Sequence, residues 1–426
     1  MTDFIGHGEK EIKERILNPG EAKNKIKNLV SVEISGRIAR ECIDLGYGFF
    51  TPLEGFMKKA DVDSVCKKMS LADGTIWPIP IVFDISSQEV SEKGIRVGDV
   101  ILLTRMGNPL AVLEVEEIFT YDKDEMAQAV LGTIDAKHPG VRMIGRMQDT
   151  FIGGKVTLVN EPQFNPPFDR FFYTPRQLRE EFKKRGWVRI VAHQTRNVPH
   201  TGHEWLMKGA WFCAHGEAPV IGDKDEIKLG TGVLVNCIIG PKRTGDYIDE
   251  AIVLAHQALH EGRYFRDDVH MVSITCWDMR YAGPKEAIFH AILRTNLGCT
   301  HHMFGRDHAG VGDYYGTYDA HRIFDQLPPG SLNIKPVRVL EWWYCPLCGE
   351  VTYSGLCGHT KERQKFSGTL IRSIIKDGVK PTRIIMRPEV FDVVMECAER
   401  YGFGSPFCTE EYLAKRGPVF VVPPLD

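Results

Sequence analysis

The 426-residue chain lacks several features that would assign it at once to a class of protein. It has no run of about 18 apolar residues, as a membrane span would need, and its first residues, MTDFIGHGEKEIKERI, lack the apolar core of a signal peptide. Its formal net charge is only -3, which gives no global attraction for nucleic acid or for an anionic membrane. We therefore expect a cytoplasmic protein without nucleic-acid or membrane partners, which binds anions only at local sites.

Two further absences exclude a P-loop kinase domain and argue against a secreted, disulfide-linked protein. No Gly-x-x-x-x-Gly-Lys-Ser/Thr loop is present, so the chain carries no P-loop kinase domain. The eleven cysteines do not indicate a secreted disulfide framework, because Cys213, Cys237 and Cys397 lie within apolar runs and are expected to be buried, reduced thiols. With 43% hydrophobic residues, the chain can form packed cores in two or three domains.

The most informative segment is residues 194–203, QTRNVPHTGH. It follows a short β-branched run, residues 187–192 (WVRIVA), which is typical of a buried parallel strand. It precedes residues 204–215 (EWLMKGAWFCAH), whose apolar residues recur at the helical period. A loop that opens a helix after a strand is a natural anion site, because the helix N-terminus presents unpaired N–H groups.

The polar residues of this loop match a tetrahedral oxyanion beside a polyphosphate. Arg196 offers a bidentate fork, Gln194 and Asn197 offer neutral amides, and His200 and His203 can donate to phosphate oxygens as charge develops. The alternative is a polar loop with ordinary surface histidines. Five such side chains at the carboxyl end of one strand favour a ligand, since open α/β sheets bind their ligands there.

A second motif lies further along the chain. Residues 305–312 read GRDHAGVG and residues 313–316 read DYYG, directly after a predicted strand over residues 300–304. The His-Thr-Gly-His of the first motif resembles the signature of nucleotidyl-transferring enzymes. Together with QTRN and GRDHAG it is similar to the motifs of the sulfate adenylyltransferase (ATP sulfurylase) family. Five other segments resemble that family in the same order: YGFFTPLEGFM (47–57), WPIPIVFDI (77–85), MRYAGPKEA (279–287), SGTLIR (367–372) and RPEV (387–390).

Sequence texture divides the chain into three parts, which we predict as domains over residues 1–168, 169–335 and 336–426. In the first, short β-rich runs at residues 79–83, 100–104 and 110–115 predict a small mixed β-barrel, and the family resemblance implies a PUA-like fold. Residues 160–167 (NEPQFNPP) read as a linker, because three prolines disfavour both helix and strand.

The second part alternates between helices and strands. We expect helices over residues 247–260 and 285–296, each followed by a strand, at residues 269–274 and 300–304. This alternation predicts a Rossmann-like, doubly wound parallel sheet, in which the GRDHAG and QTRN motifs face each other across a crevice. The third part, a small α/β domain, is expected to pack beside the active site or a neighbouring subunit.

The resemblance implies a role for each motif residue. Gln194, Arg196 and the backbone at Ala309 would hold sulfate, and Thr195, Arg196 and Asn197 would lie at the reaction centre. His200 and His203 would stabilise the transition state, and the ATP would be bound by Gly305, Arg306, Asp307 and His308. Sulfate would attack the α-phosphorus of ATP directly, with Mg²⁺ on the polyphosphate, giving adenosine 5′-phosphosulfate and diphosphate. For Arg306 and Asp307 the alternative is a structural ion pair.

Two spacer positions depart from the family pattern. Many members read Arg-Asn-Pro-x-His, whereas Val198 precedes Pro199 here, and Val311 stands where GRDHAGPG is commoner. Both changes leave the polar residues in place, so we expect them to shift loop conformation without abolishing activity.

Cysteines near residue 350 suggest a metal site. Cys345 and Cys348 form a Cys-x-x-Cys turn, and Cys357 and His359 follow within fifteen residues of it. Four N/S ligands predict a tetrahedral structural zinc site, with a free-thiol turn or a redox cysteine pair as the alternative.

Two other functions would share part of this sequence pattern. One is an adenylyl transferase that acts on a carboxylate, which would share His-x-Gly-His but neither GRDHAG nor the QTRN donors. The other is a non-enzymatic RNA-binding protein built from a PUA-like domain and a zinc knuckle, for which the chain lacks a clustered basic and aromatic face. The resemblance favours the sulfate-activating enzyme and implies a homo-oligomer.

Overall fold

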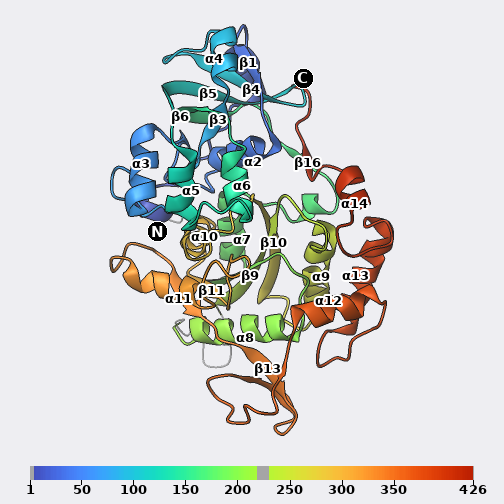
Figure 1. Cartoon of the computed structure of the whole chain (residues 1–426). Helices are drawn as coiled ribbons and strands as arrows, with labels where there is room; N and C mark the ends of the chain where they lie inside the picture. Colours follow the sequence, from blue (N-terminus) through green and yellow to red (C-terminus); the bar gives the residue numbers. More distant parts are fainter. Residues whose placement is uncertain (1–3, 218–229, 426) are drawn as a thin grey trace.

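The N-terminal part of the chain is built on a mixed β-sheet (Figure 1). The computed structural model describes residues 4–217 and 230–425. The strands are β1 (Val30–Glu33), β2 (Gly55–Phe56), β3 (Phe83–Ile85), β4 (Val100–Arg105), β5 (Asn108–Phe119) and β6 (Thr150–Leu158). They lie in the order β1-β4-β5-β6-β2, with β3 also paired to β6, and only β1 and β4 pair in parallel. The accompanying helices are α1 (Pro19–Lys25), α2 (Gly36–Gly46), α3 (Lys59–Lys68), α4 (Ser87–Lys93), α5 (Lys123–Leu131) and α6 (Pro139–Gly145).

Two details of this part differ from the sequence prediction. The runs at residues 100–104 and 110–115 are strands, but the run at 79–83 is not, and β3 begins only at Phe83. Pro78 and Pro80 explain this, because proline has no N–H to donate to a strand ladder. The predicted linker at 160–167 contains a two-residue strand, β7 (Gln163–Phe164), which pairs with β16 (Phe420–Val421). Its partner comes from the far end of the chain, which no local pattern could reveal.

The second sheet is entirely parallel and has the order β10-β9-β8-β11-β12. Its strands are β8 (Arg189–Thr195), β9 (Thr231–Ile239), β10 (His270–Cys276), β11 (His301–Phe304) and β12 (Lys335–Arg338). The helices that precede or connect these strands along the chain are α7 (Pro175–Lys184), α8 (Thr201–His215), α9 (Asp249–Glu261), α10 (Pro284–Asn296) and α11 (Asp319–Arg322). The strand order reverses between β8 and β11, which makes that boundary the topological switch point of the sheet.

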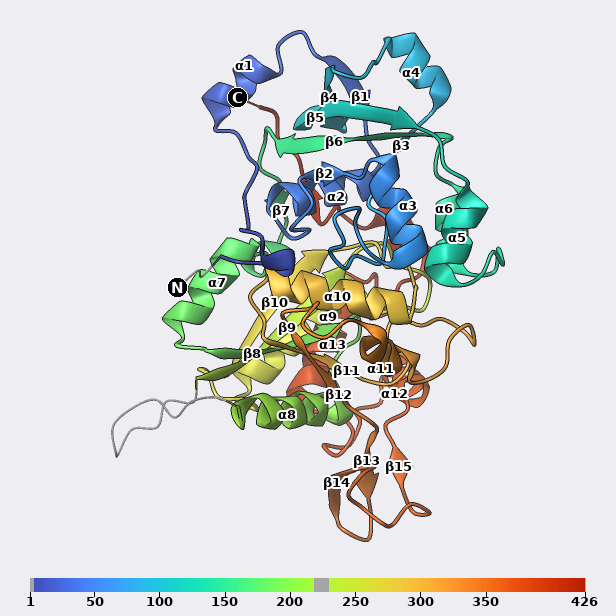
Figure 2. The ribbon, with the colours of Figure 1, turned by 90° about the vertical axis from the view of Figure 1, so that its left-hand side faces the viewer.

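Both faces of this sheet are buried, as a doubly wound fold requires. Val191 and Val233 belong to one core with residues of α8 and α9, whereas the adjacent Ile190 and Leu234 belong to a second core with residues of α10. Figure 2 shows α8 and α10 on opposite sides of the sheet. The predicted Rossmann-like arrangement is confirmed.

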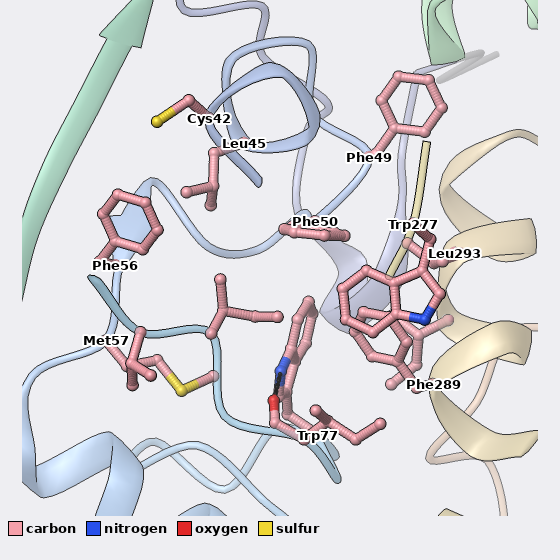
Figure 3. Packing of buried hydrophobic residues seen from close by; sticks show 14 of the residues in the cluster. Cys42, Leu45, Phe49, Phe50, Phe56, Met57, Trp77, Trp277, Phe289 and Leu293 are labelled. Atoms are coloured by element: carbon pink, nitrogen blue, oxygen red, sulfur yellow. Dashed lines mark hydrogen bonds between the residues drawn. The ribbon is translucent and has the colours of Figure 1, made fainter. Parts of the chain in front are cut away.

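The core on the α10 side also joins the two sheets. Phe50 and Trp77, from the N-terminal part, contact Phe289 of α10 with ring centroids 5.6 Å away in each case, and Phe50 meets Trp277 edge-on at 5.8 Å (Figure 3). All four side chains are fully buried. The N-terminal sheet is therefore packed onto one face of the parallel sheet through a dry aromatic contact.

The C-terminal part packs on the opposite face and extends below it (Figure 1). It contains a small antiparallel sheet of β13 (Trp342–Cys345), β14 (Glu350–Tyr353) and β15 (Gln364–Lys365), followed by α12 (Gly368–Lys376), α13 (Pro388–Arg400) and α14 (Glu410–Lys415). Val390 and Val394 of α13 share a core with Ile252 of α9. Across residues 4–217 and 230–425, no helix has both the length and the apolar character needed to cross a membrane.

The prediction of buried thiols holds for Cys237 and Cys397 but is wrong for Cys213, which is exposed. Helix α8 turns Met207, Ala210 and Ala214 toward the sheet, and Cys213 falls on its outer side.

Candidate functional site

The two motif loops leave neighbouring strands at the switch point. The QTRN loop follows β8, the GRDHAG loop follows β11, and these two strands are paired in parallel. The predicted placement of both motifs at the carboxyl edge of one sheet is confirmed. Strand β8 is longer than predicted, so Gln194 and Thr195 are its last residues, and Val198 in the following loop is buried in the core.

The two histidines of the first loop are fixed by the helix that they begin. His200 is the N-cap of α8, and its Nδ1 accepts a hydrogen bond from the Gly202 amide at 3.0 Å. The Nδ1 of His203 accepts from the His200 amide at 3.4 Å, and the two rings lie 3.9 Å apart. Because both Nδ1 atoms accept, the proton of each neutral ring lies on Nε2. Each histidine thus keeps an Nε2–H donor for a ligand.

Both rings are neutral at physiological pH. Burial lowers the pKa of His203 to about 4, with Arg372 adding to the effect, and burial beside His203 lowers the pKa of His200 well below its usual value. Burial likewise lowers the pKa of the neighbouring His256 to about 3. Positive charge at this loop must therefore come from residues other than its histidines.

Thr195 and Asn197 form a tight turn at the end of β8. The hydroxyl of Thr195 lies 3.1 Å from both the amide nitrogen and the carbonyl oxygen of Asn197, and His256 Nε2 lies 3.2 Å from the same carbonyl. Arg372 donates to the side-chain oxygen of Asn197 at 2.7 Å. This bond fixes the Asn197 amide, so that its NH2 group faces away from Arg372.

Arg196 is held by three neighbours. Its Nη1 donates to the Tyr281 hydroxyl at 2.7 Å, and its Nη2 donates to the Pro241 carbonyl at 3.1 Å and to Asp246 at 3.5 Å. Burial opposes its charge, but Tyr281 and Asp246 outweigh burial and raise its pKa. A guanidinium has five N–H donors, so Arg196 is oriented and still has donors to offer.

Gln194 has a buried side-chain oxygen without a hydrogen-bond partner within residues 4–217 and 230–425. An unpaired buried amide is costly in a protein interior. Rotation of the amide by 180° would present its NH2 group at the same point, which makes Gln194 a neutral donor for an anion.

The GRDHAG loop is more open and more strained. Arg306 and Asp307 are exposed and form an ion pair at 2.9 Å, and Arg306 also pairs with Glu341 at 3.1 Å. The ion pair that was the structural alternative for these residues is thus present. Asp307 and Ala309 have positive φ values of 52° and 53°, a conformation that non-glycine residues rarely adopt.

His308 differs from its neighbours in this loop. Its Nε2 lies 3.1 Å from His290 Nδ1, and its ring packs on Phe304 with centroids 4.9 Å apart. Burial lowers its pKa to about 3. The ring is therefore directed into the core, and it is the loop backbone around it that lines the crevice.

Residues 282–284 (AGP), which begin helix α10, contact the GRDHAG loop. The Gly283 amide donates to the Ala309 carbonyl at 3.1 Å. Gly283 has a φ of 52°, and a Cβ there would lie 2.7 Å from the Tyr315 ring. A cavity of ≈ 180 Å³ lies between this segment and the loop, lined by Asp307, His308 and Gly312 among others. Direct hydrogen bonds between this loop and the QTRN loop are absent from the part of the chain that the structure describes.

The C-terminal part completes the candidate site with residues that the sequence motifs did not predict. Phe366 lies against the His200 ring at 5.7 Å, Arg372 bonds Asn197, and Arg387 makes a two-pronged ion pair with Glu204, both bonds being 2.8 Å. A Cβ at Gly202 would lie 2.9 Å from the Phe366 ring, so a glycine is required there. Arg372 and Arg387 belong to the SGTLIR and RPEV segments, whose presence was the available signal.

Glu204, the partner of Arg387, is buried and ionised. It is 1% exposed. Burial raises its pKa, but hydrogen bonds from Arg387 and Lys208 outweigh burial, so that the net pKa is lowered. Glu204 is thus ionised in the first turn of α8 and ties α13 to the helix that carries His203.

The four predicted metal ligands converge. The sulfur atoms of Cys345, Cys348 and Cys357 and the Nδ1 of His359 lie within 4.8 Å of one another. The Nδ1 of His359 is 3.5, 3.3 and 3.6 Å from the three sulfur atoms in turn, and the sulfur atoms of Cys348 and Cys357 are 3.7 Å apart. The cluster can hold a metal ion. Its ligands come from the β13–β14 turn and from the segment between β14 and β15, in the small sheet that lies away from the switch point (Figure 2).

Comparison with known proteins gives consistent results. Residues 169–397 match the model of the ATP-sulfurylase family, and residues 5–161 match a PUA-like domain. A sulfate adenylyltransferase of Archaeoglobus fulgidus is 40% identical over 400 residues, covering 88% of this chain and 85% of the relative. One of Hyperthermus butylicus is 40% identical over 375 residues, covering 88% and 90%.

A solved structure shows the same fold. It is titled hexameric APS kinase from Thiobacillus denitrificans, and it matches with a TM-score of 0.69 and 20% identity over 92% of this chain and 68% of its own. At this identity the likeness concerns the fold alone.

Proposed function

The chain belongs to the ATP-sulfurylase family, and we propose that it is a nucleotidyltransferase that transfers the adenylyl group of ATP to sulfate, giving adenosine 5′-phosphosulfate and diphosphate. The observation that carries this proposal is the loop at the end of β8, in which Gln194, Arg196 and two Nε2–H histidines accompany Asn197, and Arg372 bonds Asn197 from another part of the chain. The relatives named for this reaction support it over a carboxylate-activating enzyme and over an RNA-binding protein.

We propose that sulfate is bound by Gln194, Arg196 and the backbone of Ala309. Arg196 is held in place by Tyr281, Pro241 and Asp246, so its remaining donors are oriented before any substrate binds. Preorientation matters here, because the reaction needs one sulfate oxygen in line with the phosphorus.

In the proposed reaction a sulfate oxygen forms a bond to the α-phosphorus of ATP. The bond from that phosphorus to the bridging oxygen breaks, and its electron pair leaves with diphosphate. No proton is transferred, so no general base is required. ATP enters as its Mg²⁺ complex, in which the ion neutralises part of the polyphosphate charge.

The leaving diphosphate is the point at which negative charge grows. We propose that His200 and His203 donate from Nε2 to its oxygens, and that Thr195 and Asn197 position the α-phosphate. Because both histidines are neutral, we assign the cationic part of this stabilisation to Arg372, which adjoins Asn197 and lowers the pKa of His203. Gly305, Arg306, Asp307 and His308 are proposed to line the ATP site.

We propose that the metal at the cysteine cluster is structural zinc. A tetrahedral zinc with bonds of about 2.3 Å to sulfur and about 2.0 Å to nitrogen separates two sulfurs by about 3.8 Å and a sulfur from a nitrogen by about 3.5 Å. The separations in this cluster, 3.7 Å and 3.3 to 3.6 Å, support that assignment. Elemental analysis of protein purified without chelators tests it, and a protein free of zinc would contradict it.

We also propose domains over residues 1–168, 169–335 and 336–426, a cytoplasmic location and a homo-oligomer. The family models, which end at residue 161 and begin at residue 169, support the first boundary. The free cysteines fit a reducing compartment. The solved neighbour titled hexameric supports an oligomer, which light scattering of the full chain would test.

The reaction can be tested directly. Pure protein given ATP, Mg²⁺ and sulfate should release diphosphate, and molybdate in place of sulfate should drive ATP consumption through an unstable adenylate. Arg196→Ala should lose about 10³-fold in activity, because an oriented oxyanion donor is worth this much in related chemistry, while its thermal unfolding stays cooperative. Absence of diphosphate with both anions would refute the activity, and full activity of Arg196→Ala would refute the role of that residue.

A further inference from the structure

A second cavity, of ≈ 470 Å³, lies next to the proposed site and has no role in the reaction as described so far. It lies at the same carboxyl edge of the parallel sheet, where Pro241 and Arg243 follow β9 and Asp278 and Tyr281 follow β10. Helix α6 of the N-terminal part covers it with Arg142 and its neighbours. The cavity thus lies between the parallel sheet and the N-terminal part, and it is open to solvent on one side.

Most charges in its wall are already paired. Arg37 pairs with Glu41 and Asp84, Lys242 pairs with Asp249 at 2.8 Å, and Asp278 pairs with Arg40. Two of these pairs, Arg37–Glu41 and Lys242–Asp249, bury the carboxylate almost completely. These groups form the structure of the wall and contribute little net charge to it.

Three arginines in the wall are left over. Arg142, Arg146 and Arg243 have no carboxylate within ion-pair distance in residues 4–217 and 230–425. Arg142 donates to the carbonyls of Ala136 and Lys137, which orients it without neutralising it. The cavity therefore carries an excess of positive charge that the described chain does not balance.

Apolar methionine side chains form another part of the cavity wall and strengthen the electric field of the arginines. Met143, Met147 and Met279 line the cavity and are largely buried. Charges at a low-dielectric wall inside a concave surface interact more strongly with an anion than the same charges on an open surface. Arg142, Arg146 and Arg243 are exposed at this concave surface, so a small anion can reach all three from solvent.

The cavity communicates with the sulfate-binding arginine. Tyr281 and Pro241 both line it, and both accept hydrogen bonds from the guanidinium of Arg196. Arg243 stacks on the same Tyr281 ring, 4.4 Å from its centroid, and Arg196 lies 5.7 Å from that centroid. Tyr281 therefore contacts both Arg243 of the cavity and Arg196.

We propose that this cavity is a second binding site for a small tetrahedral oxyanion, from which sulfate passes to Arg196. This inference rests on the proposed function for the identity of the anion. Arg142, Arg146 and Arg243 concentrate sulfate beside the reaction centre, and Tyr281 marks the point of transfer. The site binds the free anion and takes no part in the bond-forming step.

The test compares two double variants with the same loss of charge. Arg146→Gln with Arg243→Gln removes two cations from the cavity, and Arg263→Gln with Arg266→Gln removes two exposed cations that precede β10, at the opposite edge of the sheet. At low ionic strength the cavity variant should raise the KM for sulfate about tenfold relative to the control, with kcat changed less than about twofold, and added salt should shrink the difference. Calorimetric titration of nucleotide-free protein with sulfate should find two sites in the wild type and one in the cavity variant.

An unchanged KM for sulfate, or a single sulfate site in the wild type, would overturn the proposal. Arg243→Lys, which keeps the charge, should keep the wild-type KM and so separates lost charge from lost folding. Two sulfate sites in a protein that releases no diphosphate would refute the proposed function but keep the cavity site. Diphosphate release with only one sulfate site would do the reverse.

Discussion

The QTRN loop and the GRDHAG loop leave adjacent strands, yet they are built in opposite ways. The first is half-buried, its histidines cap a helix, and its arginine and asparagine are held by Tyr281 and Arg372. In the second, Arg306 and Asp307 are exposed and pair with each other, and the backbone takes up strained positive φ values. The difference teaches that the side chains of the first loop are held in place without a ligand, whereas those of the second are free to adjust to one.

The pH dependence of stability should show the largest effect of this difference. Well above pH 6.5, the buried histidines beside the first loop are neutral in both the folded and the unfolded chain, so they do not lower stability there. As pH falls below 6.5, these histidines become protonated in the unfolded chain but stay neutral in the folded chain, so the folded state loses stability. The loss continues down to the folded pKa, which is about 4 for His203 and about 3 for His256. Each such group should remove a few kcal/mol from the free energy of unfolding.

Urea unfolding at pH 7, 6, 5 and 4 measures this loss. His203→Gln should show a shallower fall than the wild type, because one of the groups that resist protonation is gone. A free energy of unfolding that stays constant down to pH 4 would mean that the first loop is not dry, and the contrast between the loops would be lost.

Removing Arg372 should produce the next largest effect. Arg372→Gln should lower kcat about 10²-fold, or about 3 kcal/mol, because the only cation that contacts Asn197 in residues 4–217 and 230–425 is lost. Lys376→Gln, at the exposed end of the same helix α12, is the matched control and should keep normal kcat. Initial rates at saturating ATP and sulfate measure both. Equal kcat in the two variants would show that Arg372 only joins the C-terminal part to the sheet.

The smallest effect should come from the open loop. Arg306→Gln should lower kcat/KM for ATP less than about tenfold, or about 1 kcal/mol, since its ion pairs with Asp307 and Glu341 are exposed and screened by water. Steady-state rates with varied ATP test this. A loss as large as that of Arg372→Gln would show that the GRDHAG loop is as preorganised as the first, which would break the comparison.

Local sequence patterns were sufficient for the elements that form by local rules. The strand and helix around residues 194–203, the alternation that follows and the four metal ligands are all found where the spacing predicted them. The strand expected at residues 79–83 does not form because Pro78 and Pro80 cannot donate to a strand ladder. Strand β7 could not be predicted locally, because its partner is residues 420–421.

Arg372 and Phe366 could not be predicted for the same reason as β7, because their contacts are with residues distant in the sequence. Arg372 and Phe366 meet the QTRN loop from about 170 residues away, and nothing in the local composition of α12 shows where that helix will pack. The neutral state of His200 and His203 was also hidden, since burial and the capping bonds exist only in the folded chain. The sequence motifs named candidate residues for the site but did not show which of them carry charge.

The bond between Asn197 and Arg372 has a consequence for how the protein is made. A ribosome releases the QTRN loop long before it reaches residue 372, so the β8–α8 unit exists for some time without its cation. The two halves of the proposed reaction centre meet only when nearly the whole chain has emerged. We therefore expect a nascent chain that ends before residue 372 to transfer no adenylyl group to sulfate, so that catalytic competence is acquired late in synthesis.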